Sequence, residues 1–395
     1  MEEKLIVEGE VLTSAKVEEL VAKGNEAYAP HLWDLYAFLQ RWFAPSAQMT
    51  LHTSGSTGCP KEIVVEKERM RASARMTCHR LNLKAGDRAL LCMNLRYIGA
   101  MMVVVRALVA GMELVVRPAS GHPLRDLDEQ VTFAAMVPLQ VYHSLREERE
   151  KFSAIDKVII GGGAVESELE ADLRMLPNEV YSTYGMTETL SHIALRRLNG
   201  ASASRGYRPL EGVQVGLSEE STLWIDAPAV CDHRLTTNDI AEMLGDGSFR
   251  IRGRRDNVVN SGGVKIQIEE VEAEIREAWI RQMASLEDAQ QGQNSPNDRG
   301  KLQNRDASHD RDASNDCATP PQFALTAIAD TRLGEALTLL VEGEGQEKLW
   351  ERLDLEKYHR PQRIFYVDRI PLTGNGKIDR VACRHLAKQK AESLE

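Results

Sequence analysis

The chain has 395 residues and a formal net charge of −10, and its hydrophobic share of 43% is typical of a globular protein. This length suggests two or more domains, and the acidic balance argues against nucleic acid as a main partner. The start, MEEKLIVEGE, is acidic and lacks a signal-peptide pattern. The longest apolar stretch is interrupted by Arg106 and Glu113, so we expect no membrane span. The six cysteines are scattered, which favours a reducing cytoplasm over a disulfide framework or a zinc site.

Strand and helix patterns alternate through the first half of the chain. Apolar runs predict strands at 88–92, 113–117, 131–138 and 157–164, and a helical pattern occupies 98–110. This alternation predicts a mainly parallel sheet in a large α/β domain, to which we assign residues 1–255. Near its end, STLWIDAP and SFRIRG alternate as antiparallel strands do.

A smaller α+β domain is predicted for residues 256–395. It opens with an amphipathic helix, and FALTAIADTRLGEALTLLVEG then reads as a pair of strands. One face of the helix carries Ile268, Val271, Ile275 and Trp279. Residues 285–322 contain no aromatic side chain and repeat RDAS, so we expect a disordered insertion there.

The segment LHTSGSTGCPK, residues 51–61, combines hydroxyls, glycines and a lysine between apolar runs. Backbone N–H groups and hydroxyls in such a loop suit a polyanion, and Lys61 adds a positive charge at its end. The Walker pattern requires Gly-Lys followed by Ser or Thr, whereas two residues separate Gly58 from Lys61. The alternative interpretation is a solvent-exposed linker.

Four further segments carry polar groups in a specific order. They are STYGMTET (182–189), TTNDIAEM (236–243) with an acid expected in a turn, RGRRDNVVNSGGVKIQIEEVE (252–272) and IPLTGNGKIDR (370–380). Singly, each has a structural interpretation, and the glycine run at 161–163 alone predicts only a turn. Together with the 51–61 loop they resemble the core motifs of the adenylate-forming superfamily, which includes acyl-CoA synthetases, peptide-synthetase adenylation domains and luciferases.

This resemblance implies an enzyme that uses ATP and Mg²⁺ to convert a carboxylic acid to an acyl adenylate and then transfers the acyl group to coenzyme A. The family's phosphate loop corresponds here to Thr53, Ser54, Gly55, Ser56, Thr57, Gly58 and Lys61. The implied adenine pocket and its flanking motif consist of Gly161, Gly162, Gly163, Ala164, Tyr184, Gly185 and Met186. Thr187 is expected to contact the α-phosphate, and Glu188 to hold Mg²⁺.

The resemblance also assigns roles around the predicted domain boundary. Asp239 is expected to bind the ribose hydroxyls with help from Arg254, although Asn238 stands where the family usually has glycine. Asp256 is the implied hinge. Two glycines, Gly262 and Gly263, are expected near the thiol arm of coenzyme A.

Two more roles concern the chemistry and the acid. Lys377 is implied as the catalytic lysine, carried by the small domain. Tyr97 stands where the family often has an aromatic gate beside the acyl pocket. The segment before the phosphate loop is shorter than in most of the superfamily, so a subdomain that normally flanks the acyl pocket is largely absent.

A narrower resemblance concerns LRYIGAMMVVVRALVAGM and YGMTETLSHIALRRLNG, which are similar to the o-succinylbenzoate–CoA ligases of menaquinone biosynthesis. Their substrate keeps one carboxylate ionised inside the acyl pocket, where it needs a cationic or hydrogen-bonding partner. In a regular strand His192 and Arg196 share one face, so we predict that Ser191, His192 and Arg196 bind the acid, with His192 first. The alternative for Arg196 is a solvated charge at a strand end.

Three other functions remain open at this point: a CoA ligase for another aryl or acyl acid, an adenylation enzyme that loads a carrier protein, and a non-catalytic relic that only binds nucleotide. The intact Glu188, Asp239 and Lys377 argue against the relic. The sequence carries no signal for an oligomeric state.

Overall fold

The computed structural model describes residues 3–52, 62–292, 320–343, 350, 352–373 and 377–393. The chain forms two compact units. The first unit comprises Met1–Thr237 and Ala241–Ile251, and the second comprises Asn238–Ile240 and Arg252–Glu395. Among the described residues, no helix is long and apolar enough to cross a membrane.

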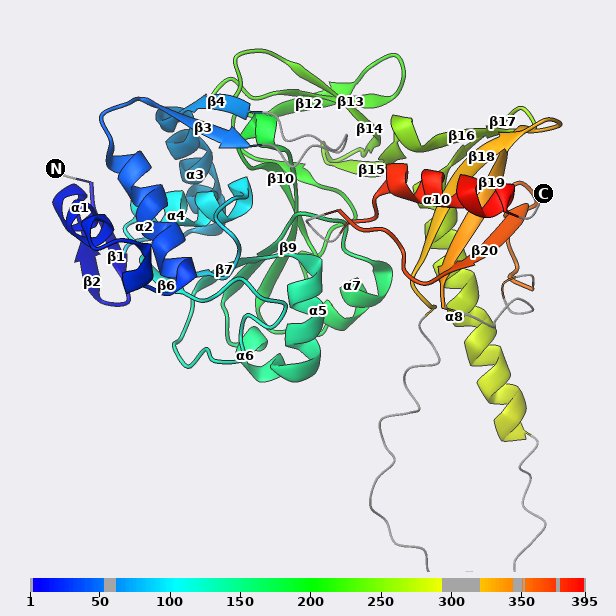
Figure 1. Ribbon diagram of the computed structural model, residues 1–395, viewed down its shortest axis with the longest axis horizontal. Helices are drawn as coiled ribbons and strands as arrows, with labels where there is room; N and C mark the ends of the chain where they lie inside the picture. Colours follow the sequence, from blue (N-terminus) through cyan, green and yellow to red (C-terminus); the bar gives the residue numbers. More distant parts are fainter. Residues whose placement is uncertain are drawn as a thin grey trace, which may run out of the picture. The chain divides into compact units, whose positions relative to one another are not determined.

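A nine-stranded sheet forms the centre of the first unit (Figure 1). Its strands are β1 (Leu5–Val7), β2 (Glu10–Leu12), β5 (Arg88–Leu91), β6 (Glu113–Val116), β7 (Phe133–Met136), β8 (Lys157–Ile160), β9 (Glu179–Gly185), β10 (His192–Arg197) and β11 (Arg208–Pro209). They lie in the order β11-β10-β9-β8-β7-β5-β6-β1-β2. The six strands from β9 to β1 in that order are parallel, and β2, β10 and β11 are antiparallel to their neighbours. The predicted parallel α/β sheet is therefore confirmed.

Helices cover both faces of this sheet. They are α1 (Ser14–Ala22), α2 (Pro30–Phe43), α3 (Lys67–Leu81), α4 (Ile98–Ala110), α5 (Pro138–Glu147), α6 (Arg149–Ser153) and α7 (Ser167–Leu173). Val158 and Ile160 of β8 pack in one core with α5, α6 and α7, whereas Ile159 joins a second core with α2, α3 and α4. Burial on both faces explains why the parallel strands are continuous apolar runs in the sequence.

Two smaller antiparallel sheets are built from strands that follow one another in the sequence. One is a hairpin of β3 (Gln48–His52) and β4 (Glu62–Glu66). The other contains β12 (Gln214–Leu217), β13 (Thr222–Asp226), β14 (Leu235–Met243) and β15 (Phe249–Arg254), in that order. The prediction that Asp239 sits in a turn is wrong, because it lies in the middle of β14 and is nine-tenths buried. Asn and Asp are poor strand formers, but sheet context overrides such weak preferences.

The second unit contains a five-stranded sheet packed against two helices. Its elements are β16 (Val258–Ser261), β17 (Val264–Gln267), α8 (Ile268–Gly292), β18 (Phe323–Asp330), β19 (Gly334–Glu342), β20 (Arg363–Val367) and α10 (Arg380–Glu392). The strand order is β17-β16-β19-β18, and β20 runs parallel to β19. The four predicted apolar residues of α8 are buried in one core of this unit. Cys383 and Ala387 of α10 pack in another core, with residues of β18, β19 and β20.

The predicted insertion begins later than the sequence suggests. Residues 285–292 continue α8 as helix, so disorder from 285 is wrong. This stretch, SLEDAQQG, is rich in residues that tolerate helix well, which explains the error. Residues 293–319 lie outside the described residues, as do residues 53–61 of the predicted phosphate loop.

A buried ion pair covers the outer edge of the small sheet. Glu272 of α8 and Arg380 of α10 form a bidentate pair with N–O distances of 2.6 and 2.7 Å. Glu272 also accepts from the backbone N–H of Leu325 at 2.8 Å, and Arg380 donates to the carbonyl of Leu325 at 3.0 Å. Since β18 is an edge strand, the pair satisfies backbone groups that would otherwise lack partners.

Candidate active site

The carboxyl ends of the parallel strands β7, β8 and β9 meet at one edge of the large sheet, where ligands bind in open α/β folds. The glycine run follows β8 at this edge. A Cβ on Gly161 would lie 2.7 Å from Oγ1 of Thr183, and Gly162 has φ +82°. Both positions therefore require glycine, and the turn exposes backbone to whatever binds at the edge.

The motif YGMTET connects β9 to β10 by a tight turn. A Cβ on Gly185 would lie 2.2 Å from the carbonyl oxygen of Ser191, so the two strands can approach each other only with glycine there. Oγ1 of Thr189 closes the turn, 3.0 Å from the N–H of Met186 and 2.7 Å from the carbonyl of Ser191. Thr187 and Glu188 occupy the short 3₁₀ helix η2 (Thr187–Thr189) inside this closed turn.

The carboxylate of Glu188 is exposed, and among the described residues no cation pairs with it. Carboxylate oxygens are the ligands that Mg²⁺ prefers. The residue therefore fits the predicted magnesium role.

An aromatic group lies beside this turn. The ring of Tyr184 is 5.2 Å from that of Phe249, edge to face, and 5.8 Å from that of Tyr207. Tyr207 is fixed in turn by a 2.8 Å hydrogen bond between its hydroxyl and that of Ser182. Tyr184 is only half-buried, so it offers a supported aromatic surface of the kind on which a flat base packs.

Behind the turn lies a polar cluster within the largest apolar core. His192 of β10 is buried, with Nε2 3.0 Å from Oγ1 of Thr77. Because the Thr77 hydroxyl donates to the carbonyl of Ser73 at 3.2 Å, it accepts from His192, which assigns the imidazole proton to Nε2. Nδ1 therefore carries the lone pair, and it faces the guanidinium of Arg106 at 3.5 Å.

Arg106 and Thr77 are the residues of this cluster that the sequence did not predict. Arg106 lies on α4, its side chain is 1% exposed, and it donates to Oγ of Ser191 at 2.7 Å. Burial lowers the pKa of Arg106 to about 10, which still leaves it charged at neutral pH. Within the described part of the chain no carboxylate pairs with it, and its Nε has no hydrogen-bond partner. The available signal was a lone cation in the otherwise apolar helix 98–110.

The same surroundings determine the charge of His192. Burial, and then the neighbouring charge of Arg106, hold its pKa well below the ordinary value of 6.5. His192 is therefore neutral at physiological pH. It orients Arg106 and Ser191 and does not itself supply a positive charge.

Arg196 lies in a different environment from His192. Its guanidinium forms a bidentate pair with Glu170 of α7 at 3.0 and 2.7 Å and lies 5.7 Å from the centre of the Tyr207 ring. The register of β10 shifts between His192 and Ala194, which breaks the regular alternation. The prediction that His192 and Arg196 share one strand face is therefore wrong, and so is the view of Arg196 as a solvated charge.

In the second unit, Arg254 lies between two acids. It donates to Asp239 at 3.2 Å and to Asp256 at 2.8 Å. Asp256 itself lies in the 3₁₀ helix η3 (Arg255–Asn257) that follows β15. The predicted ribose pair, Asp239 and Arg254, is thus in direct contact, and the predicted hinge residue contacts the same guanidinium.

Lys377 ends a small hairpin in the same unit. The N–H of Thr373 donates to the carbonyl of Lys377 at 2.7 Å, and Leu372 forms a β-bridge with Ile378. The side chain is exposed, yet protein atoms near its amine, and then the charge of Arg254, lower its pKa, while Asp239 opposes the shift. Lys377, Arg254 and Asp239 therefore interact electrostatically within this unit.

The remaining predicted residues have separate positions. Gly262 (φ +58°) and Gly263 (φ +82°) form the two-residue turn between β16 and β17, where both central residues need positive φ. Tyr97 precedes α4 and is 38% exposed. Ala164 is exposed next to the glycine turn.

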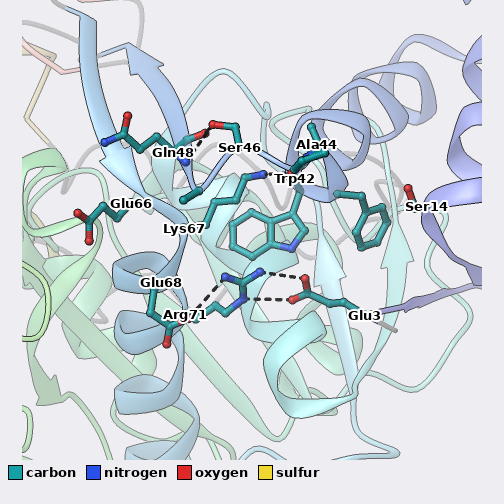
Figure 2. Close-up of a pocket in the computed structure, with 13 residues that line it drawn as sticks. Glu3, Ser14, Trp42, Ala44, Ser46, Gln48, Glu66, Lys67, Glu68 and Arg71 are labelled. Carbon is teal, nitrogen blue, oxygen red and sulfur yellow. Dashed lines mark hydrogen bonds and ion pairs between the residues drawn. The ribbon is translucent and has the colours of Figure 1, made fainter. Parts of the chain in front are cut away.

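A cavity of about 570 Å³ opens elsewhere in the first unit (Figure 2). Arg71 crosses it, paired with Glu3 at 3.0 Å and placed 4.8 Å from the centre of the Trp42 ring. Lys67 donates to the carbonyl of Ala44 at 2.8 Å, and burial, with the charge of Arg71, lowers its pKa. The described lining contains none of the residues predicted for ATP, coenzyme A or the acid, so this cavity is separate from the candidate site.

Comparison with known proteins identifies the family. The family model described as "AMP-binding enzyme" matches residues 18–224, which is more than half of the chain. The chain belongs to the AMP-binding enzyme family. The matched range contains the glycine turn and the YGMTET turn.

Curated members of the family that resemble this chain are longer. A 2-succinylbenzoate–CoA ligase of Escherichia coli (strain K12) is 30% identical over 238 residues, covering 57% of this chain and 51% of that protein. The enzyme of the same name from Salmonella typhimurium is 27% identical over 71% of this chain and 61% of its own length. The chain thus spans about half to six tenths of the curated relatives it matches.

Solved structures of AMP-binding enzymes share the fold. An acyl-CoA synthetase (AMP-forming)/AMP-acid ligase II-like protein from Dyadobacter fermentans is 32% identical, covers 94% of this chain and 97% of its own, and has a TM-score of 0.56. The o-succinylbenzoate CoA synthetase of Bacillus subtilis with its acyl-adenylate intermediate is 19% identical, covers 84% of this chain and 68% of its own, and has a TM-score of 0.65. These likenesses confirm the predicted fold class of a large parallel-sheet domain with a smaller, mainly antiparallel one.

Proposed function

We propose that this AMP-binding enzyme is an acid–CoA ligase that activates o-succinylbenzoate through an acyl adenylate. The names of its curated relatives support the reaction type and the acid. The observation that carries the choice of acid is Arg106, a buried guanidinium without a carboxylate partner in the described chain, directly behind the YGMTET turn.

A buried, unpaired charge destabilises a fold, so its presence calls for a compensating ligand. The ring carboxylate of o-succinylbenzoate is such a ligand, because it stays ionised while the succinyl carboxylate is activated. Arg106 supplies the positive charge. Oγ of Ser191 accepts from Arg106 and lies 3.4 Å from the lone pair on Nδ1 of His192, so the hydroxyl proton can turn from Nδ1 to a carboxylate oxygen when the acid binds. His192, neutral and fixed by Thr77, holds both groups in place.

The nucleotide part of the proposal rests on residues that fit their roles within each unit. Tyr184 and the glycine turn suit adenine, and Asp239, supported by Arg254, suits the ribose hydroxyls. Mg²⁺ is proposed to bind at the exposed carboxylate of Glu188, where it supplies charge neutralisation for phosphate oxygens. Lys377 is proposed to add a second positive charge during attack of the acid on the α-phosphate.

The test compares two acids on the wild-type protein. In 4-oxo-4-phenylbutanoate the ring carboxylate is absent and the reacting succinyl group is unchanged. With ATP, Mg²⁺ and coenzyme A, kcat/KM for thioester formation should favour o-succinylbenzoate by about 10²-fold or more, the scale expected when a buried polar partner is left unpaired. Equal kcat/KM for the two acids would show that the ring carboxylate is not recognised, and would refute o-succinylbenzoate as the specific substrate. Thioester formation on a phosphopantetheinyl carrier protein, with none on coenzyme A, would instead identify a carrier-loading enzyme.

A further inference from the structure

Two histidines and a glutamate gather on the surface of the first unit, outside the residues assigned above. They are His122, His143 and Glu147, and one ligand atom from each lies within 4.8 Å of the others. Nδ1 of His122 is 2.9 Å from one oxygen of Glu147, and Nδ1 of His143 is 3.9 Å from the other. The two imidazole rings are 4.4 Å apart.

The spacing of these residues is set by secondary structure. His143 and Glu147 are four residues apart on α5, so their side chains lie on the same face one turn from each other. His122 approaches from the segment between β6 and β7. A Cβ on the neighbouring Gly121 would lie 3.6 Å from the ring of His143, which shows how closely this segment passes α5.

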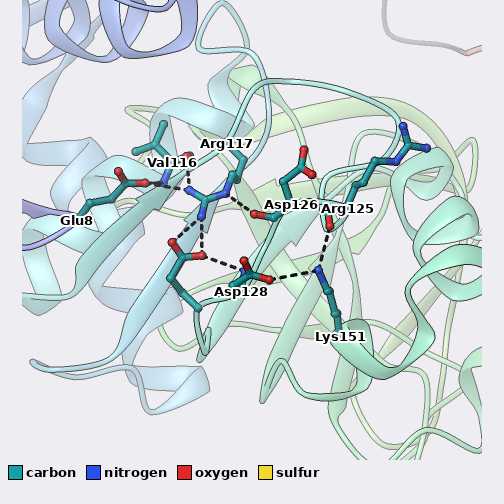
Figure 3. Close-up of polar contacts among 8 residues, drawn as sticks. Glu8, Val116, Arg117, Arg125, Asp126, Asp128 and Lys151 are labelled. Carbon is teal, nitrogen blue, oxygen red and sulfur yellow. Dashed lines mark hydrogen bonds and ion pairs between the residues drawn. The ribbon is translucent and has the colours of Figure 1, made fainter.

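Ion pairs hold the segment that carries His122 in place (Figure 3). At its start, Arg117 pairs with Glu8 at 2.9 Å and donates to Glu129 at 2.6 Å. Further along, Lys151 donates to the carbonyl of Arg125 at 2.9 Å. His122 is therefore presented to α5 by an anchored segment, close to the other two residues.

The existing contacts leave the cluster incompletely satisfied. Nδ1 of His122 is shielded from solvent, and among the described residues it has no hydrogen-bond partner, although it lies 2.9 Å from Glu147. Among the described residues, Arg125, whose side chain is 60% exposed, donates to Glu147 at 3.2 Å. A cation bound by both His122 and Glu147 would give this shielded nitrogen a partner.

We propose that His122, His143 and Glu147 form a binding site for a divalent transition-metal ion of the zinc class. Imidazole nitrogens favour Zn²⁺, Ni²⁺ and Cu²⁺ over Mg²⁺ and Ca²⁺, which prefer oxygen ligands. With metal–ligand bonds of about 2.0–2.2 Å, two ligands of one ion lie at most about 4.3 Å apart. The 2.9 and 3.9 Å separations from Glu147 meet this limit, and all three ligand atoms lie within 4.8 Å of one another, so small side-chain rotations would bring the whole set into range of one ion. Three protein ligands leave a position for water.

The test is titration of the full-length protein with ZnCl₂ by calorimetry, after treatment with a chelator and its removal. The wild type should bind one Zn²⁺ at this site, and His122→Ala/His143→Ala should weaken that binding by at least about 10-fold, the lower end of the loss seen when even an outer partner of a metal site is removed. Arg125→Gln should strengthen it, because Glu147 then loses a competing cation. Zn²⁺ should also raise the thermal midpoint of the wild type more than that of the double variant.

The matched control is His79→Ala. His79 is 80% exposed, and its nearest carboxylate is Glu211 at 3.4 Å, so this pair resembles part of the cluster without completing it. Zn²⁺ binding should be unchanged in this variant. If the double variant and the wild type bind Zn²⁺ with equal affinity and stoichiometry, or if Arg125→Gln weakens binding, the assignment is overturned. MgCl₂ in place of ZnCl₂ should give no signal that depends on the two histidines.

Discussion

Replacing Arg106 by methionine tests the proposed acid pocket most sharply, because it should lower activity toward the diacid without lowering thermal stability. Methionine keeps most of the side-chain length and removes the guanidinium that donates to Ser191. Since that guanidinium is buried without a carboxylate partner in the described chain, the fold should not depend on its charge.

The expected losses follow from these contacts. Removing one partner of a buried, hydrogen-bonded charge pair costs about 2–5 kcal/mol of binding, which is a factor of roughly 30 to a few thousand in kcat/KM. This loss should apply to o-succinylbenzoate. For 4-oxo-4-phenylbutanoate, which has no ring carboxylate, kcat/KM should change only a few-fold. The thermal midpoint of the ligand-free protein should stay the same or rise, because an uncompensated buried charge has been removed.

The assay measures AMP release with each acid, and differential scanning fluorimetry of the same preparations gives the midpoint. His192→Asn serves as a comparison, because it removes a neutral orienting group and should lower use of the diacid less than Arg106→Met does. A variant that loses activity equally with both acids and melts several degrees lower would show that Arg106 has a structural role. The proposed recognition of the diacid would then be refuted.

Four other outcomes are expected. Lys377→Ala should slow adenylate formation by about 10²–10³ while sparing thioester formation from pre-made acyl adenylate, and equal loss of both half-reactions would contradict its role. Asp256→Pro should do the reverse, because proline fixes φ at the proposed hinge, and full overall turnover would place the hinge elsewhere. Replacing residues 293–319 by a short Gly/Ser linker should leave turnover within a few-fold, since loop closure depends weakly on length, whereas inactivity of a folded protein would oppose this. The pKa of His192 is held well below its unfolded value near 6.5, so its contribution to stability is present above pH 6.5 and is lost as the pH falls below that value. Between pH 7.5 and 5.5 the wild type should therefore lose more stability than His192→Asn, and an equal loss in the two proteins, measured by denaturant unfolding, would contradict the assignment.

The sequence predicts the large sheet well because each of its parallel strands is visible as a short apolar run of consecutive residues. Each parallel strand is buried on both faces, so runs such as KVII stand out, and the helix 98–110 ends where Gly111 takes positive φ. Glycines required by close approach, such as Gly185, also leave a visible motif.

The proposed acid pocket could not be predicted in this way. Arg106 and Thr77 reach His192 across 86 and 115 residues of sequence, and neither belongs to a motif. The bulge in β10 leaves no mark in the alternation of side chains, so Arg196 was grouped with His192 although it pairs with Glu170. Long-range packing, not local propensity, leaves Arg106 without a carboxylate partner among the described residues and pairs Arg196 with Glu170.

Pyrophosphate exchange tests the central claim most directly. The wild-type protein is mixed with ATP, Mg²⁺ and labelled pyrophosphate, with coenzyme A omitted, and label entering ATP is followed with and without o-succinylbenzoate. If the protein forms an acyl adenylate from this diacid, exchange should depend on both the acid and Mg²⁺ and should be weak with 4-oxo-4-phenylbutanoate. Nucleotide binding without exchange for any acid tested would contradict the account and identify a protein that binds ATP without activating a carboxylate.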